Sequence, residues 1–218
     1  MDDALSPARW RLCVITDEHL GRGRSHLRIA EAAIRGGADV VQLRDKTASG
    51  RRLYEIALGL RRLTREAGVP LIVNDRLDVA LAADADGVHV GRGDLPAAVA
   101  RRILGPGRIL GVSAGTVEDS VAAERDGADY LGVGPVFEAR ASKADAAAPL
   151  GLELVTRVRR ACRLPIVAIG GINPGNARLV RNEGADAAAV ISAVVSADDI
   201  AEAARHLKRL LSGPEESG

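Results

Sequence analysis

The sequence predicts a (β/α)8 barrel, because short apolar runs alternate with helical patterns eight times along the chain. Runs that are apolar throughout are typical of parallel strands buried on both faces of a sheet. With 218 residues, the chain suits the small end of this fold class. We expect the strands near residues 11–16, 39–44, 70–74, 86–90, 108–113, 129–134, 165–169 and 186–191.

A repeated tripeptide supports this alternation. Each copy ends an amphipathic segment, where a glycine stops a helix, and opens the next apolar run. Within the segments between runs, apolar residues recur three and four positions apart, as one face of a helix requires. The copies are Gly37-Ala38-Asp39, Ala85-Asp86-Gly87, Gly127-Ala128-Asp129 and Gly184-Ala185-Asp186.

A doubly wound open sheet is the competing fold. That fold usually carries a glycine-rich dinucleotide fingerprint in its first strand-to-helix turn. The corresponding turn here, residues 16–20, contains no glycine, and Gly21 and Gly23 follow too late and without a third glycine. The first turn therefore favours the barrel.

Composition limits the domain count and the classes of function. No Ser/Pro-rich linker or low-complexity stretch divides the chain, so we expect one domain over residues 1–218, with about 1–8 and 212–218 as flexible tails. The 30 basic and 29 acidic residues nearly balance, and there are only one Trp, one Phe and two Tyr. This composition argues against a nucleic-acid partner and favours small-molecule ligands.

Targeting signals are the next question. No apolar run approaches the roughly 18 residues of a membrane span, and residues 1–7 lack the basic and apolar regions of a signal peptide. We expect a cytoplasmic protein without a membrane partner. The sequence does not indicate whether the chain is a monomer or an oligomer.

The second apolar run ends in a polar cluster. Gln42, Arg44 and Lys46 alternate along the chain and would share one face of a strand, whereas Leu43 would pack on the other face. Two cations and an amide on one face suit a phosphate or a diphosphate. The alternative is an exposed strand end with solvated charges.

Other strand ends are also polar, and in this fold class the active site forms at the carboxyl ends of the strands. Gly170-Gly171 and Ile191-Ser192-Ala193 are typical of a phosphate site, in which backbone N–H groups approach the anion. The alternative is that these residues only form turns. His89 lies between two valines, which favours a packed, hydrogen-bonded barrel histidine over a catalytic base.

Two carboxylates follow neighbouring strands. Asp75 and Asp94 are suited to share a Mg²⁺ ion with substrate oxygens, because magnesium commonly takes one or two carboxylates. Asp75 is also suited to cap a helix starting near Arg76. One carboxylate cannot easily fill both roles.

Taken in order, these motifs resemble the thiamine-phosphate synthase family from about Leu12 to Leu210. Each motif alone is weak, but their order and their places at strand ends make the resemblance specific. The motifs are Gln42-Leu43-Arg44-Asp45-Lys46, Val73-Asn74-Asp75-Arg76, Asp86-Gly87-Val88-His89-Val90-Gly91, Asp94-Leu95-Pro96, Gly111-Val112-Ser113, Gly132-Val133-Gly134-Pro135-Val136-Phe137, Ser142-Lys143, Ile169-Gly170-Gly171-Ile172 and Val190-Ile191-Ser192-Ala193.

The resemblance implies a transferase reaction. It would condense 4-amino-2-methyl-5-(diphosphooxymethyl)pyrimidine with 4-methyl-5-(2-phosphoethyl)thiazole, or its 2-carboxylate, and release thiamine phosphate and diphosphate. The family's mechanism is dissociative: the C–O bond to diphosphate breaks first and leaves a pyrimidine-stabilised carbocation. Such chemistry requires no protein nucleophile, and the sequence contains no Ser/His/Asp or Cys/His arrangement.

The resemblance also implies roles for single residues. Asp75 and Asp94 would ligate the Mg²⁺ cofactor, and Arg44, Lys46, Ser113 and Lys143 would be catalytic. The pyrimidine diphosphate would be held by Gln42, Leu43, Arg44, Asp45, Lys46, Asn74, Ser113 and Lys143. The thiazole phosphate would lie against Gly171, Ile191 and Ser192, with help from Arg140, Ala141 and Ser142.

Departures from the family pattern leave alternatives open. Lys143 comes one residue later than expected in a segment, 138–149, that we interpret as a lid, and Arg140 stands where a Thr is usual; either cation is a candidate to close on the diphosphate. Arg92 replaces a common Gln. A thiazole tautomerase-like isomerase of the same superfamily typically carries a His where this chain has Gly115. A noncatalytic barrel that binds a phosphate ligand is the third candidate.

Overall fold

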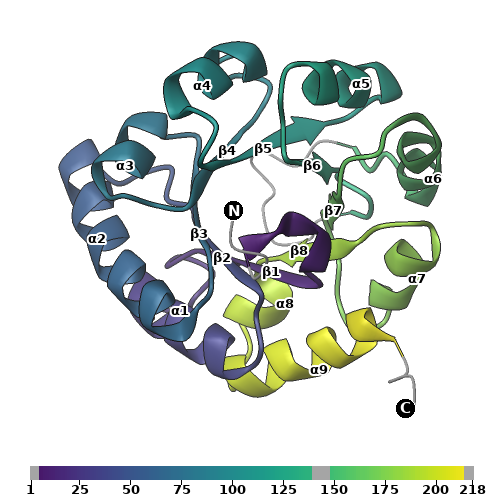
Figure 1. The fold of residues 1–218 in the computed structure, drawn as a ribbon. Coiled ribbons are helices and arrows are strands. Elements are labelled where there is room, and N and C mark those ends of the chain that lie inside the picture. The colour runs from purple at the N-terminus through teal and green to yellow at the C-terminus, as the bar shows by residue number, and fades with distance from the viewer. Residues whose placement is uncertain (1–4, 139–147, 214–218) are drawn as a thin grey trace.

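The computed structural model describes residues 5–138 and 148–213, and it forms a closed parallel barrel whose strands follow the order β1 to β8 around the ring (Figure 1). This is the predicted fold. Seven of the eight strands lie within their predicted ranges, and β5 extends one residue further. The strands are β1 Leu12–Thr16, β2 Val40–Leu43, β3 Leu71–Asn74, β4 Gly87–Val90, β5 Ile109–Ala114, β6 Tyr130–Val133, β7 Ile166–Ile169 and β8 Ala187–Val190.

Helices surround this ring on the outside, and they alternate with the strands as predicted (Figure 1). An additional one-turn helix, α8, follows β8 and precedes the last long helix, α9. The helices are α1 His26–Arg35, α2 Gly50–Ala67, α3 Leu77–Ala82, α4 Ala97–Leu104, α5 Val117–Arg125, α6 Leu152–Ala161, α7 Ala177–Asn182, α8 Ser192–Val195 and α9 Ile200–Ser212.

The two ends of the chain fall partly outside the described residues. Within the segments expected as tails, a 3-10 helix spans Pro7–Arg9, and α9 continues to Ser212. None of the described helices is long and apolar enough to cross a membrane.

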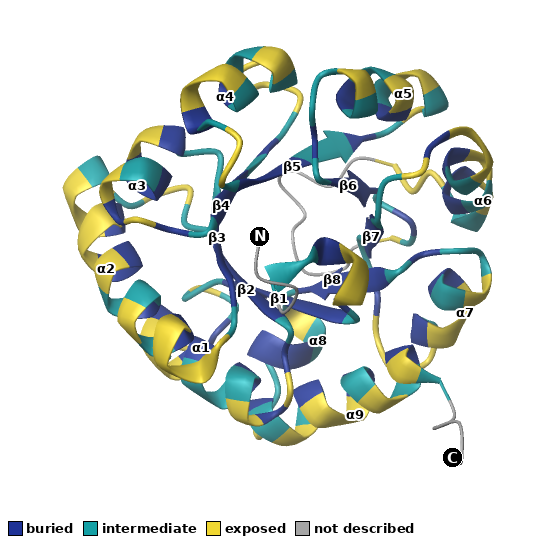
Figure 2. Cartoon of the chain, in the orientation of Figure 1, coloured by how far each residue is buried: buried dark blue, intermediate teal, exposed yellow. Residues whose placement is uncertain are grey.

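Buried side chains form two layers, one inside the barrel and one between the strands and the helices. Figure 2 shows the strands coloured mostly as buried, whereas the surrounding helices carry many exposed residues. Strand alternation divides the two layers: Cys13 and Ile15 point into the barrel, whereas Leu12 and Val14 pack under the helices. Trp10 closes the interior layer beside the start of β1 and is 1% exposed. The interior layer comprises Trp10, Cys13, Ile15, Val40, Ile72, Ile109, Tyr130, Val167, Ala187 and Ala189.

The aspartates of the tripeptide repeat join the strands in pairs at the amino end of the barrel. Each precedes an even-numbered strand, and its Oδ2 accepts an N–H at the start of the preceding odd-numbered strand. The acceptor and donor pairs are Asp39 with Arg11 and Leu12 at 2.8 Å, Asp86 with Leu71 at 2.8 Å, Asp129 with Leu110 at 2.7 Å, and Asp186 with Ile166 at 2.7 Å.

A cation from an outer helix neutralises each of these carboxylates. The partners are Lys208 of α9 for Asp39, Arg61 of α2 for Asp86, Arg101 of α4 for Asp129, and Arg159 of α6 for Asp186. The repeat that marks strand starts in the sequence therefore also ties strand to strand and helix to barrel.

One copy of the repeat departs at its first position. Gly37, Gly127 and Gly184 adopt positive φ angles of 90°, 88° and 100° immediately before the Ala-Asp pair. Asp84 holds the equivalent position at φ 53°, a left-handed conformation that glycine adopts without strain. The structural register of this copy is thus Asp84-Ala85-Asp86, one residue earlier than the tripeptide chosen from the sequence.

We expect Asp39→Ala to destabilise the fold, because it leaves the N–H groups of Arg11 and Leu12 without their acceptor. An unsatisfied buried donor costs about 1–3 kcal/mol, which lowers Tm by roughly 2–12 °C in a chain of this size. Thermal unfolding followed by circular dichroism measures the change. Asp198→Ala is the control: that side chain is 95% exposed, and its loss should change Tm by no more than a degree or two. Equal Tm values for Asp39→Ala and the parent would contradict this role.

A candidate active site at the carboxyl end of the barrel

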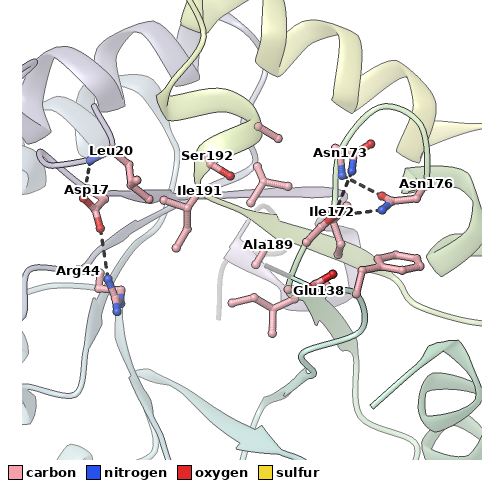
Figure 3. Close-up of a pocket in the computed structure, with 16 residues that line it drawn as sticks. Asp17, Leu20, Arg44, Glu138, Ile172, Asn173, Asn176, Ala189, Ile191 and Ser192 are labelled. Carbon is pink, nitrogen blue, oxygen red and sulfur yellow. Dashed lines mark hydrogen bonds and ion pairs between the residues drawn. The ribbon is translucent and has the colours of Figure 1, made fainter. Parts of the chain in front are cut away.

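Two adjoining cavities open at the carboxyl ends of the strands. The smaller, of about 320 Å³, reaches into the barrel and is bordered by Gln42, Asn74, Asp75 and Ser113 among others; we call it the inner cavity. The larger, of about 620 Å³, lies over β7 and β8 and is shown in Figure 3; we call it the outer cavity. The two share part of their lining, namely Arg44, Ile169, Gly170, Ala189 and Ile191.

Two residues of the polar cluster at the end of β2, Gln42 and Arg44, border these cavities. Gln42 is 5% exposed and borders the inner cavity, whereas Leu43 is fully buried under the helices, as the alternation predicts. Arg44 borders both cavities, and its Nη1 lies 3.3 Å from Asp17 Oδ2 (Figure 3). Because β2 ends at Leu43, strand alternation does not place Lys46. Lys46 is nevertheless close enough to Asp75 to lower the pKa of that carboxyl.

Asp45 shapes the turn after β2, and its side chain borders neither cavity. Its Oδ1 accepts hydrogen bonds from the N–H and hydroxyl of Thr47, at 2.8 and 2.9 Å, and from the N–H of Ala48 at 2.9 Å. Burial would raise the pKa of Asp45, but these hydrogen bonds outweigh it and lower the pKa to about 2. Its Oδ2 faces His26 Nε2 at 3.5 Å. The side chain therefore holds the turn that carries Arg44 and Lys46.

The two predicted metal-binding carboxylates meet beside the inner cavity. Burial, a side-chain hydrogen bond with Asp94 and the charge of Asp94 raise the pKa of Asp75 to about 6, although Lys46 and Arg44 oppose the rise. Asp94 Oδ2 accepts the N–H of Gly91 at 2.7 Å. Asp75 itself has a positive φ of 62°, and its N–H donates to the His89 carbonyl at 2.8 Å. The turn after β3 thus directs one carboxylate toward the other.

The alternative role of Asp75 as a helix cap is wrong. Helix α3 begins at Leu77, its N-cap residue is Arg76 and not Asp75, and the N-cap side chain makes no capping hydrogen bond. The carboxylate pair fits a hard cation: Mg²⁺ takes one or two carboxylates and fills its other positions with water and phosphate oxygens. Among the described residues, no group of three or more His, Cys, Asp or Glu side chains gathers as a metal site.

The glycine-rich turn after β7 faces the first residue of α8 across the outer cavity (Figure 3). Gly170 and Gly171 adopt φ angles of 101° and 63°. The amides of Asn173 and Asn176 donate to the Gly171 carbonyl at 3.1 and 3.0 Å and hold the turn in place. A Cβ on Gly171 would lie 2.6 Å from the Glu138 carbonyl oxygen, so the position requires glycine. Ser192 and Ile191 line the same cavity.

His89 is packed and hydrogen-bonded, as the sequence predicts. Its Nε2 lies 2.9 Å from Ser113 Oγ, and its Nδ1 lies 3.0 Å from the Tyr130 hydroxyl. Burial lowers the pKa of His89 to about 4, although the Asp94 carboxylate opposes the shift. The ring is therefore neutral near pH 7, and it holds the Ser113 side chain at the inner cavity.

Sequence reasoning missed several residues that border the cavities, above all Asp17, Tyr130 and Asn176. Asp17 follows β1 directly, so its place at a strand end is the signal that could have identified it.

Most of the segment interpreted as a lid lies outside the described residues. It includes four of the predicted site residues, namely Arg140, Ala141, Ser142 and Lys143.

Arg92, which replaces a Gln common in the family, lies beside Gly115, the position at which the isomerase alternative carries a His. Arg92 Nη2 lies 2.8 Å from Asp119 Oδ2, and the same oxygen accepts the N–H of Gly115 at 3.1 Å. A Cβ on Gly115 would lie 2.3 Å from Arg92 Nη2. The guanidinium of Arg92 therefore covers the position at which a side chain on residue 115 would project.

Comparison with known proteins gives the family of this chain. Residues 12–194 match the family described as thiamine monophosphate synthase. The chain belongs to this family. It is 60% identical over 207 residues to a thiamine-phosphate synthase of Chloroflexus aurantiacus, covering 95% of both chains, and 53% identical over 204 residues to one of Moorella thermoacetica, covering 94% of this chain and 97% of the relative.

A solved structure also matches closely. The thiamine phosphate pyrophosphorylase from Pyrococcus furiosus superposes with a TM-score of 0.87 at 42% identity, covering 94% of this chain and 97% of that one. The family resemblance predicted from the motifs is thus confirmed, and these relatives are enzymes that act on small molecules.

The raised pKa of Asp75 predicts that the carboxylate pair destabilises the metal-free protein. The unfolded carboxyl ionises near 3.8 and the folded one near 6, so the destabilisation grows as pH rises from 3.8 to 6 and is complete above 6. In metal-free buffer near neutral pH, Asp75→Asn should therefore have a higher Tm than the parent, and this gain should shrink as the pH falls below 6.

Asp78→Asn is the matched control in the adjacent helix. A hydrogen bond from Arg76 lowers the pKa of Asp78, so removing that charge should give no gain in Tm. A Tm for Asp75→Asn at or below that of the parent across this pH range would contradict the prediction that burial and the neighbouring Asp94 disfavour the ionised Asp75 carboxyl in the folded protein.

Proposed function

We propose that the chain joins 4-amino-2-methyl-5-(diphosphooxymethyl)pyrimidine to 4-methyl-5-(2-phosphoethyl)thiazole, forming thiamine phosphate and diphosphate. The observation that carries the proposal is the meeting of two differently built anion sites at Arg44. One has cations beside a carboxylate pair and suits a diphosphate with Mg²⁺; the other is a glycine-rich turn facing Ser192 and suits a monophosphate. Membership of the thiamine monophosphate synthase family supports the same reaction.

In this proposal the inner cavity holds the pyrimidine diphosphate. Gln42 and Asn74 face the pyrimidine end, and Arg44, Lys46 and Ser113 bind the diphosphate, with Lys143 as a further predicted cation. Arg44 contributes a planar fork of donors, which suits two phosphate oxygens at once, and Asp17 holds it in orientation from the other side.

Asp75 and Asp94 would hold Mg²⁺, which supplies positive charge to the departing diphosphate. Asp75 follows the end of β3 and Asp94 lies after the end of β4, so these two strand ends supply the carboxylates that would hold the cation. Arg44 and Lys46 add positive charge where negative charge develops as the C–O bond breaks, and this preorganised stabilisation is the main contribution of the protein to the rate.

The outer cavity holds the thiazole phosphate in this proposal. The Gly170-Gly171 turn and Ser192 would face its phosphate, and the thiazole ring would lie at the shared border of Ile169 and Ile191, beside the pyrimidine methylene. The ring nitrogen then attacks the carbocation, so no general base is required. Water would capture this cation, and the apolar side chains of Ile169 and Ile191 suit a site that disfavours water.

Incubation with both substrates and Mg²⁺ tests the proposal. We expect thiamine phosphate and diphosphate to form in equal amounts, and omission of either substrate should prevent product formation. The covered position at Gly115 favours this transferase over the isomerase alternative. Conversion of a thiazole phosphate into its isomer without diphosphate release would support the isomerase, and binding of both compounds without turnover would support a noncatalytic barrel.

Arg44→Lys should not be a conservative change. The ammonium keeps the charge but loses the planar fork, and the loss of a charge-assisted hydrogen bond costs about 1.5–3 kcal/mol. We expect kcat/KM for the pyrimidine diphosphate to fall by roughly 10- to 100-fold, measured by steady-state kinetics at saturating thiazole phosphate. Arg125→Lys, on an exposed helix, is the matched control and should keep the parent value. Parent-like kinetics for Arg44→Lys would remove Arg44 from the diphosphate site.

A further inference from the structure

Two aromatic rings form the floor of the inner cavity and connect its two sides. His89 Nε2 lies 2.9 Å from Ser113 Oγ, and His89 Nδ1 lies 3.0 Å from the Tyr130 hydroxyl. The Gln42 side chain lies close enough to Tyr130 to offset part of the rise in the Tyr130 pKa caused by burial. The polar groups of Ser113, His89, Tyr130 and Gln42 therefore follow one another around the cavity, and all four residues border it.

The barrel is built around these rings. A Cβ on Gly111 would lie 2.2 Å from Tyr130 Cζ and 2.5 Å from His89 Nδ1, and one on Gly132 would lie 2.7 Å from His89 Cε1. Two neighbouring strands thus lack side chains where the rings lie. Trp10 packs edge-on against Tyr130 from below, with ring centroids 5.1 Å apart. Packing therefore fixes both rings in place.

The protons along such a row of groups have two possible arrangements, one for each direction in which every group donates to its neighbour. A neutral imidazole donates from one nitrogen and accepts at the other, and each hydroxyl has a single proton. His89 faces a hydroxyl group at each ring nitrogen, so it donates to one of them and accepts from the other. Whenever Ser113 donates into the cavity, His89 donates to Ser113, Tyr130 donates to His89, and Gln42 donates its amide N–H to Tyr130. The Gln42 carbonyl oxygen then faces the cavity as an acceptor.

We propose that Ser113, His89, Tyr130 and Gln42 form a hydrogen-bond relay that couples diphosphate binding at one side of the inner cavity to recognition of the pyrimidine amino group at the other. This inference rests on the proposed function. Diphosphate oxygens only accept hydrogen bonds, so a diphosphate at Ser113 requires the order in which Gln42 presents its oxygen. That oxygen accepts from an exocyclic amino group. His89 and Tyr130 are positioning residues in this scheme.

The place of Ser113 fits this role. A Cβ on Gly91 would lie 3.2 Å from Asp94 Oδ2 and 3.9 Å from Ser113 Oγ, so the hydroxyl and the carboxylate flank the same point at the cavity rim. The Ser113 end of the relay therefore lies on the side of the proposed metal and diphosphate, and Gln42 lies at the opposite end.

Calorimetric titration of the full chain tests the coupling without turnover. The two probes are 4-amino-5-hydroxymethyl-2-methylpyrimidine and inorganic diphosphate with Mg²⁺. In the parent, Mg²⁺ and diphosphate should raise the affinity for the pyrimidine about fivefold or more, within the usual range of coupling between sites. In Tyr130→Phe, which removes one hydroxyl and keeps the ring, the factor should fall close to one. An analogue with hydrogen in place of the amino group should show no coupling in the parent.

Two further variants keep the test decisive. Ser113→Ala breaks the relay at its other end and should also abolish the coupling, which matters if Tyr130→Phe folds poorly. Trp10→Phe alters the packing under Tyr130 and leaves the relay intact, so it should keep the coupling of the parent.

Parent-like coupling in Tyr130→Phe and Ser113→Ala would overturn the relay, as would its absence from a parent that binds both probes. Loss of coupling in Trp10→Phe would assign the effect to packing and also overturn it. Failure of the parent to bind either probe would refute the proposed function instead.

Discussion

The hydrogen bonds of four aspartates at the amino end of the barrel are the constraint on which the rest of the structure depends. Asp39, Asp86, Asp129 and Asp186 each satisfy backbone N–H groups at the start of a neighbouring strand and pair with a cation from an outer helix. Every one of these carboxylates thus has both a donor and a counter-charge. These four carboxylates at the amino end are therefore fully used in holding strands and helices together, and the proposed binding residues lie at the opposite end of the strands.

Charges at the carboxyl end are arranged in the opposite way. Asp75 and Asp94 lie against each other, and the repulsion contributes to a raised pKa for Asp75, a cost that a bound cation and its ligand would remove. Arg44 is shared between two cavities and held by Asp17. The adjacent carboxylates of Asp75 and Asp94 are suited to a cation, and the guanidinium of Arg44 is suited to phosphate oxygens. The same barrel therefore separates residues that stabilise from residues that bind.

Most of the fold was predictable from the sequence because the tripeptide repeat marks four strand starts and the strands are mostly apolar. The roles of Asp45 and Asp17 were not: Asp45 holds a turn through local hydrogen bonds to Thr47 and Ala48, and Asp17 holds Arg44 across 27 positions of the chain. The relay through His89 to Tyr130 was likewise hidden, since it joins residues 41 positions apart. Helix α8 has four residues, too few for a periodic pattern to reveal it.

The central claim is that one substrate occupies each cavity and that the two react where Arg44, Ile169 and Ile191 form their shared border. A crystal structure of the protein with thiamine phosphate, Mg²⁺ and diphosphate tests this most directly. The account predicts the phosphate of thiamine phosphate on the Gly171 turn beside Ser192, the pyrimidine in the inner cavity, and diphosphate with its metal between Arg44 and the Asp75 carboxylate. Thiamine phosphate bound in the opposite direction, with its phosphate in the inner cavity, would contradict the account. Diphosphate bound on the Gly171 turn would also contradict it.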